Sequence, residues 1–268
     1  MTGLLSLLVV VPFIFGLLLL ATKSNMLRRP VVCVGVAAVI AGSVVLAFPH
    51  VPSTVTQLAV PPETISRAML AVECAISLYL IALSVRIRKP LIALLALAQA
   101  ALLLPLEWGK GPHAEVAHYL VLDQFSVILA LIIGIIGGLI CLYSLDYMQA
   151  FHVDHFPKLH DKRPSFFATL FIFLGAMFGL VFSNHLPWVY FFWEITTLCS
   201  FWLIGYKGND ESKANAYRAL LMNLTGGLAF AGALNWLIAH GQPLEIDRLV
   251  ATRPELVLIP AAFMAFAG

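Results

Sequence analysis

The chain of 268 residues is 61% hydrophobic and only 11% charged, and its mean hydropathy is +0.94. A soluble domain carries about 25% charged residues, so this composition excludes a soluble globular protein and predicts an integral membrane protein. The formal net charge of +2 leaves no basic footprint for nucleic acid.

The apolar runs are about 17–22 residues long, which suits α-helices that cross a hydrocarbon core of roughly 30 Å. The predicted fold is therefore all-α, a polytopic bundle of transmembrane helices. The first run has no basic segment before it, so we interpret it as a membrane helix and not as a cleaved signal. Eight complete spans are expected, at residues 3–22, 31–48, 68–85, 91–106, 123–143, 166–183, 187–206 and 216–239. A ninth starts near Glu255 and reaches only Gly268, so we expect a chain that is truncated within this helix.

The loops between these spans alternate in basic charge. One side of the membrane receives 12 of the 16 Lys and Arg residues, including those of 86–89 and 207–218. Cytoplasmic loops carry the excess of Lys and Arg, so this side is assigned to the cytoplasm. The N-terminus is therefore predicted to lie outside.

Glu194 lies near the middle of the apolar passage 186–206. A carboxylate at the centre of a membrane helix costs on the order of 2.5–3.5 kcal/mol, which makes a proton or ion site the first hypothesis. Helical spacing puts Tyr190, Glu194 and Thr197 on one face, with a hydroxyl one turn to either side of the carboxylate. A structural glutamate that only holds neighbouring helices together is the alternative.

The next predicted helix supplies weaker candidates. Arg218 lies near its inner end and could serve as a charge partner, and Asn223 and Thr225 could hold water in a proton path. Its glycines are interpreted as packing residues, because small side chains let membrane helices approach closely.

Other polar residues have simpler explanations. Glu73 lies near the outer end of its helix, where water solvates it, and Gln99 lies within the fourth helix. Asp123 is expected to cap the fifth helix. The histidines and aspartates of loop 151–164 match no closed set of metal ligands, and the four cysteines stand singly in apolar runs. The sequence thus predicts no metal site and no catalytic residues of its own.

Three stretches carry a resemblance, at residues 122–148, 166–206 and 214–234. Within the second stretch, Trp193-Glu194 is followed by Leu198-Cys199-Ser200 and by the segment LIGY at 203–206. This pattern resembles the antiporter-like membrane subunits of respiratory complex I, energy-converting [NiFe] hydrogenases and Mrp-type antiporters. Residues 1–120 would then be four N-terminal spans, and residues 121–268 the start of a proton-translocation module.

The resemblance implies that Glu194 is the family's membrane glutamate, which tunes a lysine on a later helix. That lysine would follow the apolar run that ends at Gly268. Two features favour the hydrogenase type: an extra helical pair at 68–106 and the sequence 194–200. An Arg and an Asp of some complex I members correspond here to Leu224 and Gly227.

The resulting hypothesis is a proton-translocating subunit of a redox-driven complex of hydrogenase or NADH:quinone oxidoreductase type. It would lie in the inner (cytoplasmic) cell membrane with other membrane subunits and a peripheral redox arm. We expect no cofactor on this chain, and iron–sulfur, NiFe or flavin groups on its partners. It would carry protons, or Na⁺, and bind no nucleic acid. The alternatives are an Mrp-type Na⁺/H⁺ antiporter subunit without a redox arm, and a truncated or split subunit that serves as a membrane scaffold.

Overall fold

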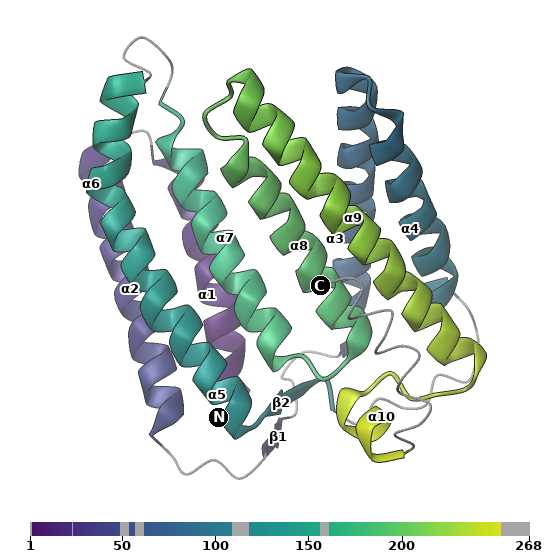
Figure 1. The fold of residues 1–268 in the computed structure, drawn as a ribbon. Coiled ribbons are helices and arrows are strands. Elements are labelled where there is room, and N and C mark those ends of the chain that lie inside the picture. The colour runs from purple at the N-terminus through teal and green to yellow at the C-terminus, as the bar shows by residue number, and fades with distance from the viewer. Residues whose placement is uncertain are drawn as a thin grey trace. The chain divides into compact units, whose positions relative to one another are not determined.

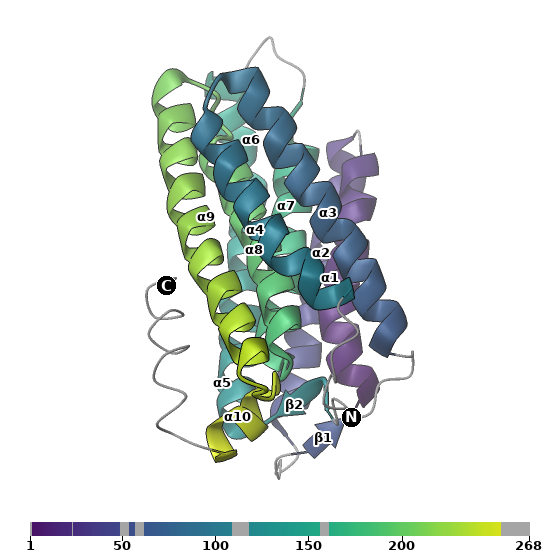
Figure 2. The same ribbon diagram turned by 90° about the vertical axis from the view of Figure 1, so that its right-hand side faces the viewer.

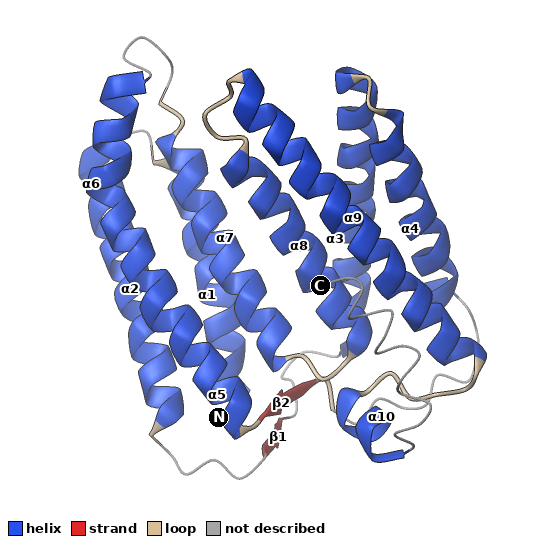
Figure 3. Cartoon of the chain, viewed as in Figure 1, coloured by secondary structure: helices blue, strands red, loops and turns tan. Residues whose placement is uncertain are grey.

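The computed structural model describes residues 2–22, 24–48, 54–56, 62–108, 118–155 and 161–252, and almost all of these are helical (Figure 3). Two short strands, β1 (Thr54–Thr56) and β2 (Leu120–Leu122), pair with each other. The helices are α1 (Thr2–Ala21), α2 (Asn25–Ala47), α3 (Pro62–Ile87), α4 (Pro90–Trp108), α5 (Gln124–Leu131), the π-helix η1 (Ile132–Gly137), α6 (Gly138–His155), α7 (Arg163–Phe182), α8 (Leu186–Ile204), α9 (Asp210–Ala239) and α10 (Ile246–Thr252).

The eight predicted spans all coincide with helices, which confirms the all-α fold class. The fifth span is longer than expected, because α5, η1 and α6 continue one another from Gln124 to His155. Within the described residues, six helical segments are long and apolar enough to cross a membrane: α1, α2, α3, the continuous α5–η1–α6 segment, α7 and α9. Helix α4 contributes a shorter apolar segment, and α8, the predicted span 187–206, is not among the six. The short helix α10 was not expected. The predicted ninth helix, from Glu255, lies outside the described residues, and the outside location of the N-terminus stays a prediction.

The chain forms two compact units, each assembled from segments that are distant in sequence. The first comprises residues 1–55 and 121–182, and the second comprises residues 56–120 and 183–268. The predicted domain boundary at residue 120 divides the chain into two continuous stretches, whereas each compact unit combines two distant segments. The predicted boundary therefore stays a prediction.

In the first unit, α1 packs along α7 and α2 packs along α6 (Figure 1). Glycines allow the first of these contacts. A Cβ atom on Gly16 would lie 3.1 Å from the backbone oxygen of Ala168, and one on Gly175 would lie 3.0 Å from that of Val9. Small residues bring membrane helices together in this way, since lipid and side chains are equally apolar and close packing supplies the attraction.

The predicted cap of the fifth span is confirmed. The Asp123 carboxylate accepts hydrogen bonds from the Ser126 backbone N–H at 2.7 Å and from the Ser126 hydroxyl at 2.6 Å. The bond from the Ser126 hydroxyl, helped by the backbone N–H, lowers the pKa of Asp123 below its ordinary value. The residue thus satisfies the free donors of a helix N-terminus and needs no further role.

Arg28 precedes the predicted span 31–48 and is one of the basic residues assigned to the loops, but the structure buries it at the start of α2 with only 2% of its surface exposed. Its Nη2 donates to Oδ2 of Asp161 at 2.8 Å and its Nη1 donates to Oδ1 of Asn25 at 2.7 Å. Arg163 adds a second ion pair to Asp161, at 2.7 Å. The two cations fix the start of α2 to the segment that leads into α7.

Replacing Asp161 by asparagine should lower the free energy of unfolding by about 2 kcal/mol at neutral pH. Breaking a buried ion pair costs roughly 3–5 kcal/mol, and we reduce this figure because 25% of the Asp161 side chain is exposed. Denaturation of the purified protein in detergent would measure the change. Arg29→Gln is the matched control, since 53% of the Arg29 side chain is exposed in its ion pair with Asp146, and exposed pairs contribute little.

The ion pairs of Asp161 with Arg28 and Arg163 also predict that the protein loses stability in acid. Burial by itself raises the pKa of Asp161, but hydrogen bonds from Arg163 and Arg28 outweigh it and hold the pKa well below its ordinary value. The stabilisation is therefore complete above the unfolded value of about 3.9 and is lost as the pH falls through the folded pKa. Asp161→Asn should remove this part of the acid dependence. If the variant loses stability at low pH as steeply as the wild type does, Asp161 is not the source of the acid dependence.

In the second unit, α3 and α4 form a hairpin, α4 packs on α9, and α8 lies against α9 and α3 (Figure 2). Side-chain hydrogen bonds connect these helices. Trp188 Nε1 donates to Ser66 Oγ at 2.9 Å and Trp202 Nε1 donates to the Tyr79 hydroxyl at 3.1 Å, and both bonds join α8 to α3. Asn235 donates to the Leu102 backbone oxygen at 2.9 Å, which joins α9 to α4. The unit is therefore a helical bundle connected by polar groups.

Candidate functional site

Helix α8 is the most aromatic helix of the second unit, and its neighbours cover most of its side chains. Pro187 stands in its first turn, where a missing backbone N–H costs nothing. Tyr190, Glu194 and Thr197 are all buried, as expected for residues that share one inward face. The carboxylate is therefore inside the bundle, with 4% of the Glu194 surface exposed.

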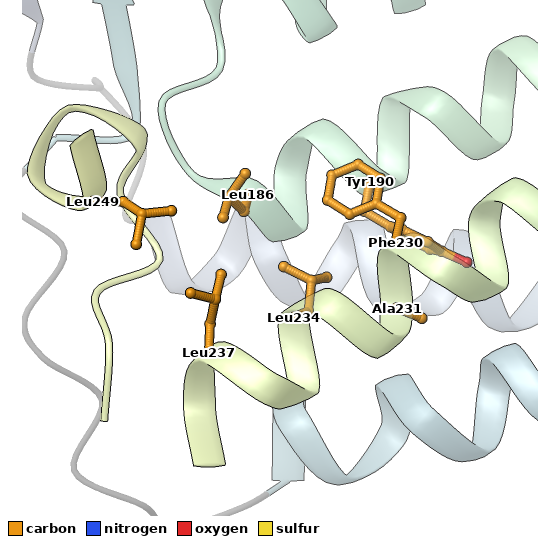
Figure 4. Close-up of a cluster of buried hydrophobic side chains, with 7 residues drawn as sticks. All are labelled: Leu186, Tyr190, Phe230, Ala231, Leu234, Leu237 and Leu249. Atoms are coloured by element: carbon orange, nitrogen blue, oxygen red, sulfur yellow. The ribbon is translucent and has the colours of Figure 1, made fainter. Parts of the chain in front are cut away.

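A cluster of buried side chains holds the N-terminal half of α8 in place (Figure 4). Tyr190 packs edge-on against Phe230 of α9, with ring centroids 5.5 Å apart. The cluster consists of Leu186, Tyr190, Phe230, Ala231, Leu234, Leu237 and Leu249. The apolar packing fixes the α8–α9 contact one turn away from Glu194, so the carboxylate projects from a rigid part of the helix.

Glu194 has polar neighbours from two other helices of the unit. Gln99 of α4 donates its Nε2 to Oε1 of Glu194 at 3.3 Å. The same nitrogen donates to the backbone oxygen of Leu224, on α9, at 3.0 Å. Tyr190 is a further hydrogen-bonding neighbour of the carboxylate on α8 itself. Buried polar groups need such partners, because an unsatisfied one costs several kcal/mol in an apolar bundle.

Gly227 of α9 makes the arrangement possible. A Cβ atom at this position would lie 2.2 Å from Gln99 Nε2 and 2.6 Å from Glu194 Oε1. The bare glycine backbone therefore leaves the space that the two side-chain ends occupy. In the sequence comparison above, Gly227 was the position at which some complex I members carry an acid.

Arg218, Asn223 and Thr225 occupy other parts of α9. Arg218 is exposed and lies nine residues before Gly227, about 13 Å along the helix axis. Thr225 is also exposed, and its hydroxyl donates to the Leu221 backbone oxygen of its own helix at 2.8 Å. Asn223 is half-buried. The structure therefore brings Tyr190 to Glu194 but places Arg218 and Thr225 on an outer face, and the roles assigned to them stay predictions.

Two residues gain importance from the fold. Gln99, with 4% of its surface exposed, was noted only as a polar residue within its helix, and it proves to be the amide partner of Glu194. Glu73 of α3 is half-buried and interacts electrostatically with Tyr190. Helix packing therefore brings Glu73 towards the face of α8 that carries Tyr190. The signal in the sequence was a lone amide in an otherwise apolar helix, which points to a helix–helix hydrogen bond without naming the partner.

The histidine-rich loop adds no metal centre within the described residues, where no group of three or more His, Cys, Asp or Glu side chains converges. His160 and the four residues before it lie outside the described ranges. At Glu194 the side chains can carry out acid–base chemistry, because the carboxylate can hold a proton or release it to a neighbour.

Comparison with known proteins finds two matching family models. Residues 108–158 match the family model described as NADH-ubiquinone oxidoreductase (complex I), chain 5 N-terminus. Residues 183–267 match the one described as NADH:quinone oxidoreductase/Mrp antiporter, TM, and these residues include Glu194 and Gly227.

Similar proteins include Na(+)/H(+) antiporter subunit A1 of Staphylococcus haemolyticus (strain JCSC1435), which is 32% identical over 157 residues. The subunits of the same name from Staphylococcus aureus strains JH9 and Newman are 30% identical over 157 residues. Each match covers 58% of this chain and 18% of the relative, so the chain spans about a fifth of these relatives. With its membrane helices and both family matches, the chain is a multi-pass membrane protein that belongs to the antiporter-like subunits shared by complex I and Mrp antiporters.

Proposed function

We propose that this chain is the Glu194-bearing part of a cation/proton antiporter subunit of Mrp type, in which Glu194 takes up and releases the transported proton. The observation that carries the proposal is the buried Glu194 carboxylate, which is hydrogen-bonded by Gln99 across the bundle. A charge in this position is costly, and intramembrane carboxylates of this kind mark ion and proton paths. The names of the similar Staphylococcus proteins support Na⁺ as the exchanged cation.

The redox-driven complex, which the sequence alone favoured, becomes the second candidate. It is supported by the two family descriptions, both of which name a quinone oxidoreductase. The names of the similar proteins favour the antiporter over it. In the redox case, the same carboxylate would respond to charge states in partner subunits. Arg218, Asn223, Thr225 and Thr197 are supporting residues in both hypotheses.

Everted membrane vesicles that contain the complete complex would separate the two candidates. A pH gradient is first set up by the respiratory chain, and Na⁺ is then added while a pH-sensitive dye reports the gradient. An Mrp-type antiporter should collapse the gradient on addition of Na⁺, and it should do so equally when an artificial pH jump replaces respiration. If proton movement instead requires an electron donor and hydrogenase or dehydrogenase subunits co-purify, the redox candidate is correct. A scaffold would give neither response.

A further inference from the structure

The side-chain amide of Gln99 has a fixed orientation. Its Nε2 faces two acceptors at once, Oε1 of Glu194 at 3.3 Å and the Leu224 backbone oxygen at 3.0 Å. A backbone carbonyl oxygen can only accept a hydrogen bond, in every protonation state of the protein. Turning the amide over would bring its oxygen against the Leu224 oxygen, so the nitrogen side stays in place.

The fixed orientation of the Gln99 amide also constrains the carboxylate of Glu194. Because the Leu224 oxygen holds the Gln99 nitrogen, Oε1 of Glu194 always faces a donor, whether the acid is ionised or protonated. A proton on Oε1 would point at the N–H group that already donates to it. The other oxygen, Oε2, has no such donor imposed on it by Gln99 and can carry the proton.

We propose that Gln99 is a positioning residue that holds Oε1 of Glu194 as a permanent hydrogen-bond acceptor, so that the site takes up and releases its proton at Oε2. The inference rests on the proposed function and deepens it. It also gives the α3–α4 hairpin, which the sequence marked as an extra helical pair, a direct part in the site. Only a proton moves in this step: Oε2 gains one from a donor in the path and later releases it to an acceptor further along the path, while Gln99 keeps its own protons.

The titratable groups around Glu194 are few among the described residues. Tyr190 lies on the same helix, and Glu73 of α3 interacts with Tyr190. Helix α4 faces the carboxylate with the Gln99 amide, and α9 faces it with Gly227. A neutral amide thus supplies the hydrogen bond to Glu194 from outside its own helix. Removing this bond should disfavour the ionised carboxylate, so the pH midpoint of transport should rise by about one unit.

The test compares Gln99→Met, which keeps the size of the side chain but removes the amide, with Asn235→Leu. Asn235 is the matched control, because its amide also joins α9 to α4, through the Leu102 backbone oxygen at 2.9 Å. Its nitrogen donates to the Leu102 and Ala231 backbone oxygens and not to Glu194. The first measurement is the pH profile of Na⁺/H⁺ exchange in everted vesicles. The second is the infrared C=O stretch of protonated Glu194 in the purified complex, assigned by its absence in Glu194→Gln.

In Gln99→Met, we expect the C=O band to move to higher wavenumber, because the hydrogen bond to Oε1 is lost, and the pH midpoint to rise. In Asn235→Leu, both should stay at their wild-type values even if stability falls. A band that does not move in Gln99→Met overturns the proposal, as does an unshifted pH midpoint. The C=O band of Glu194 can be measured whether or not the protein transports protons. If Glu194→Gln transports normally, the proposed function fails, while the band still reports the hydrogen bond.

Discussion

Replacing Glu194 by glutamine should reduce Na⁺-driven proton exchange about 100-fold or more while the complex still assembles. Glutamine keeps the shape of the side chain and can still pair with the Gln99 amide through its own oxygen. It cannot carry the transported proton, and a positioned acid–base group contributes roughly 10²–10⁴ to the rate of a proton-transfer step. Dye measurements in everted vesicles would give the exchange rate, and immunoblots of the membranes would give the amount of complex.

Glu245→Gln is the matched control for this prediction. Glu245 is the other strongly buried glutamate described in the second unit, with 2% of its surface exposed, and it pairs with Arg248 at 2.9 Å. It lies just before α10, outside the membrane-spanning helices, and accepts the His118 backbone N–H at 2.9 Å. Its neutralisation should lower stability and leave the exchange rate within about twofold of wild type. Equal losses in both variants would indicate a general effect of removing buried charge and would count against a transport role for Glu194.

The residues that the sequence placed correctly are those for which local geometry is sufficient. Tyr190, Glu194 and Thr197 share a face because any α-helix puts positions three and four apart side by side, and all three are buried. Asp123 caps α5 because an aspartate before an apolar run accepts the free N–H groups of the first turn. The spans could be predicted because a run of apolar residues has few alternatives in a membrane.

The sequence could not supply the partners across the bundle. Gln99 and Glu194 are 95 residues apart, and only the packing of α4 against α9 and of α9 against α8 brings them together. Arg28 was assigned to a loop but lies in the first turns of α2, and its burial depends on Asp161, 133 residues further along. Which face of α9 points inward is also set by packing, so the sequence did not show that Arg218 and Thr225 lie on an exposed face and Gly227 on the buried one.

The π-helix η1 illustrates a different limit. The segment IIGIIG at 132–137 is as apolar and as periodic as the α-helical turns on either side. A change from α to π hydrogen bonding adds one residue to a turn without changing the apolar pattern. The structure shows close contacts at its two glycines: a Cβ on Gly134 would lie 2.1 Å from Ser43 Oγ and one on Gly137 would lie 2.4 Å from a Leu174 methyl group. Both glycines in the π-helix therefore serve close helix packing.

Replacing Gly227 by alanine should disturb the site more than the fold. The added methyl group would lie 2.2 Å from Gln99 Nε2 and 2.6 Å from Glu194 Oε1, so both side-chain ends must move. These ends are flexible, and alanine favours a helix over glycine by about 1 kcal/mol, so the helix itself should tolerate the change. The lost hydrogen bond to a charged group is worth roughly 1.5–3 kcal/mol. We therefore expect about a tenfold loss of exchange at neutral pH, measured in everted vesicles, with little change in thermal stability.

Gly232→Ala, on the same helix, is the matched control, since a Cβ on Gly232 would meet no atom within 4 Å apart from the adjacent backbone of its own helix. It should leave exchange unchanged and stabilise α9 slightly. A double-mutant cycle then tests the mechanism. In a Gln99→Ala background, the methyl group at position 227 has the space of the missing amide, so Gly227→Ala should cause a much smaller further loss than it does alone. Additive losses would mean that Gly227 acts independently of Gln99, because the two substitutions would then affect separate contacts and not one hydrogen bond to Glu194.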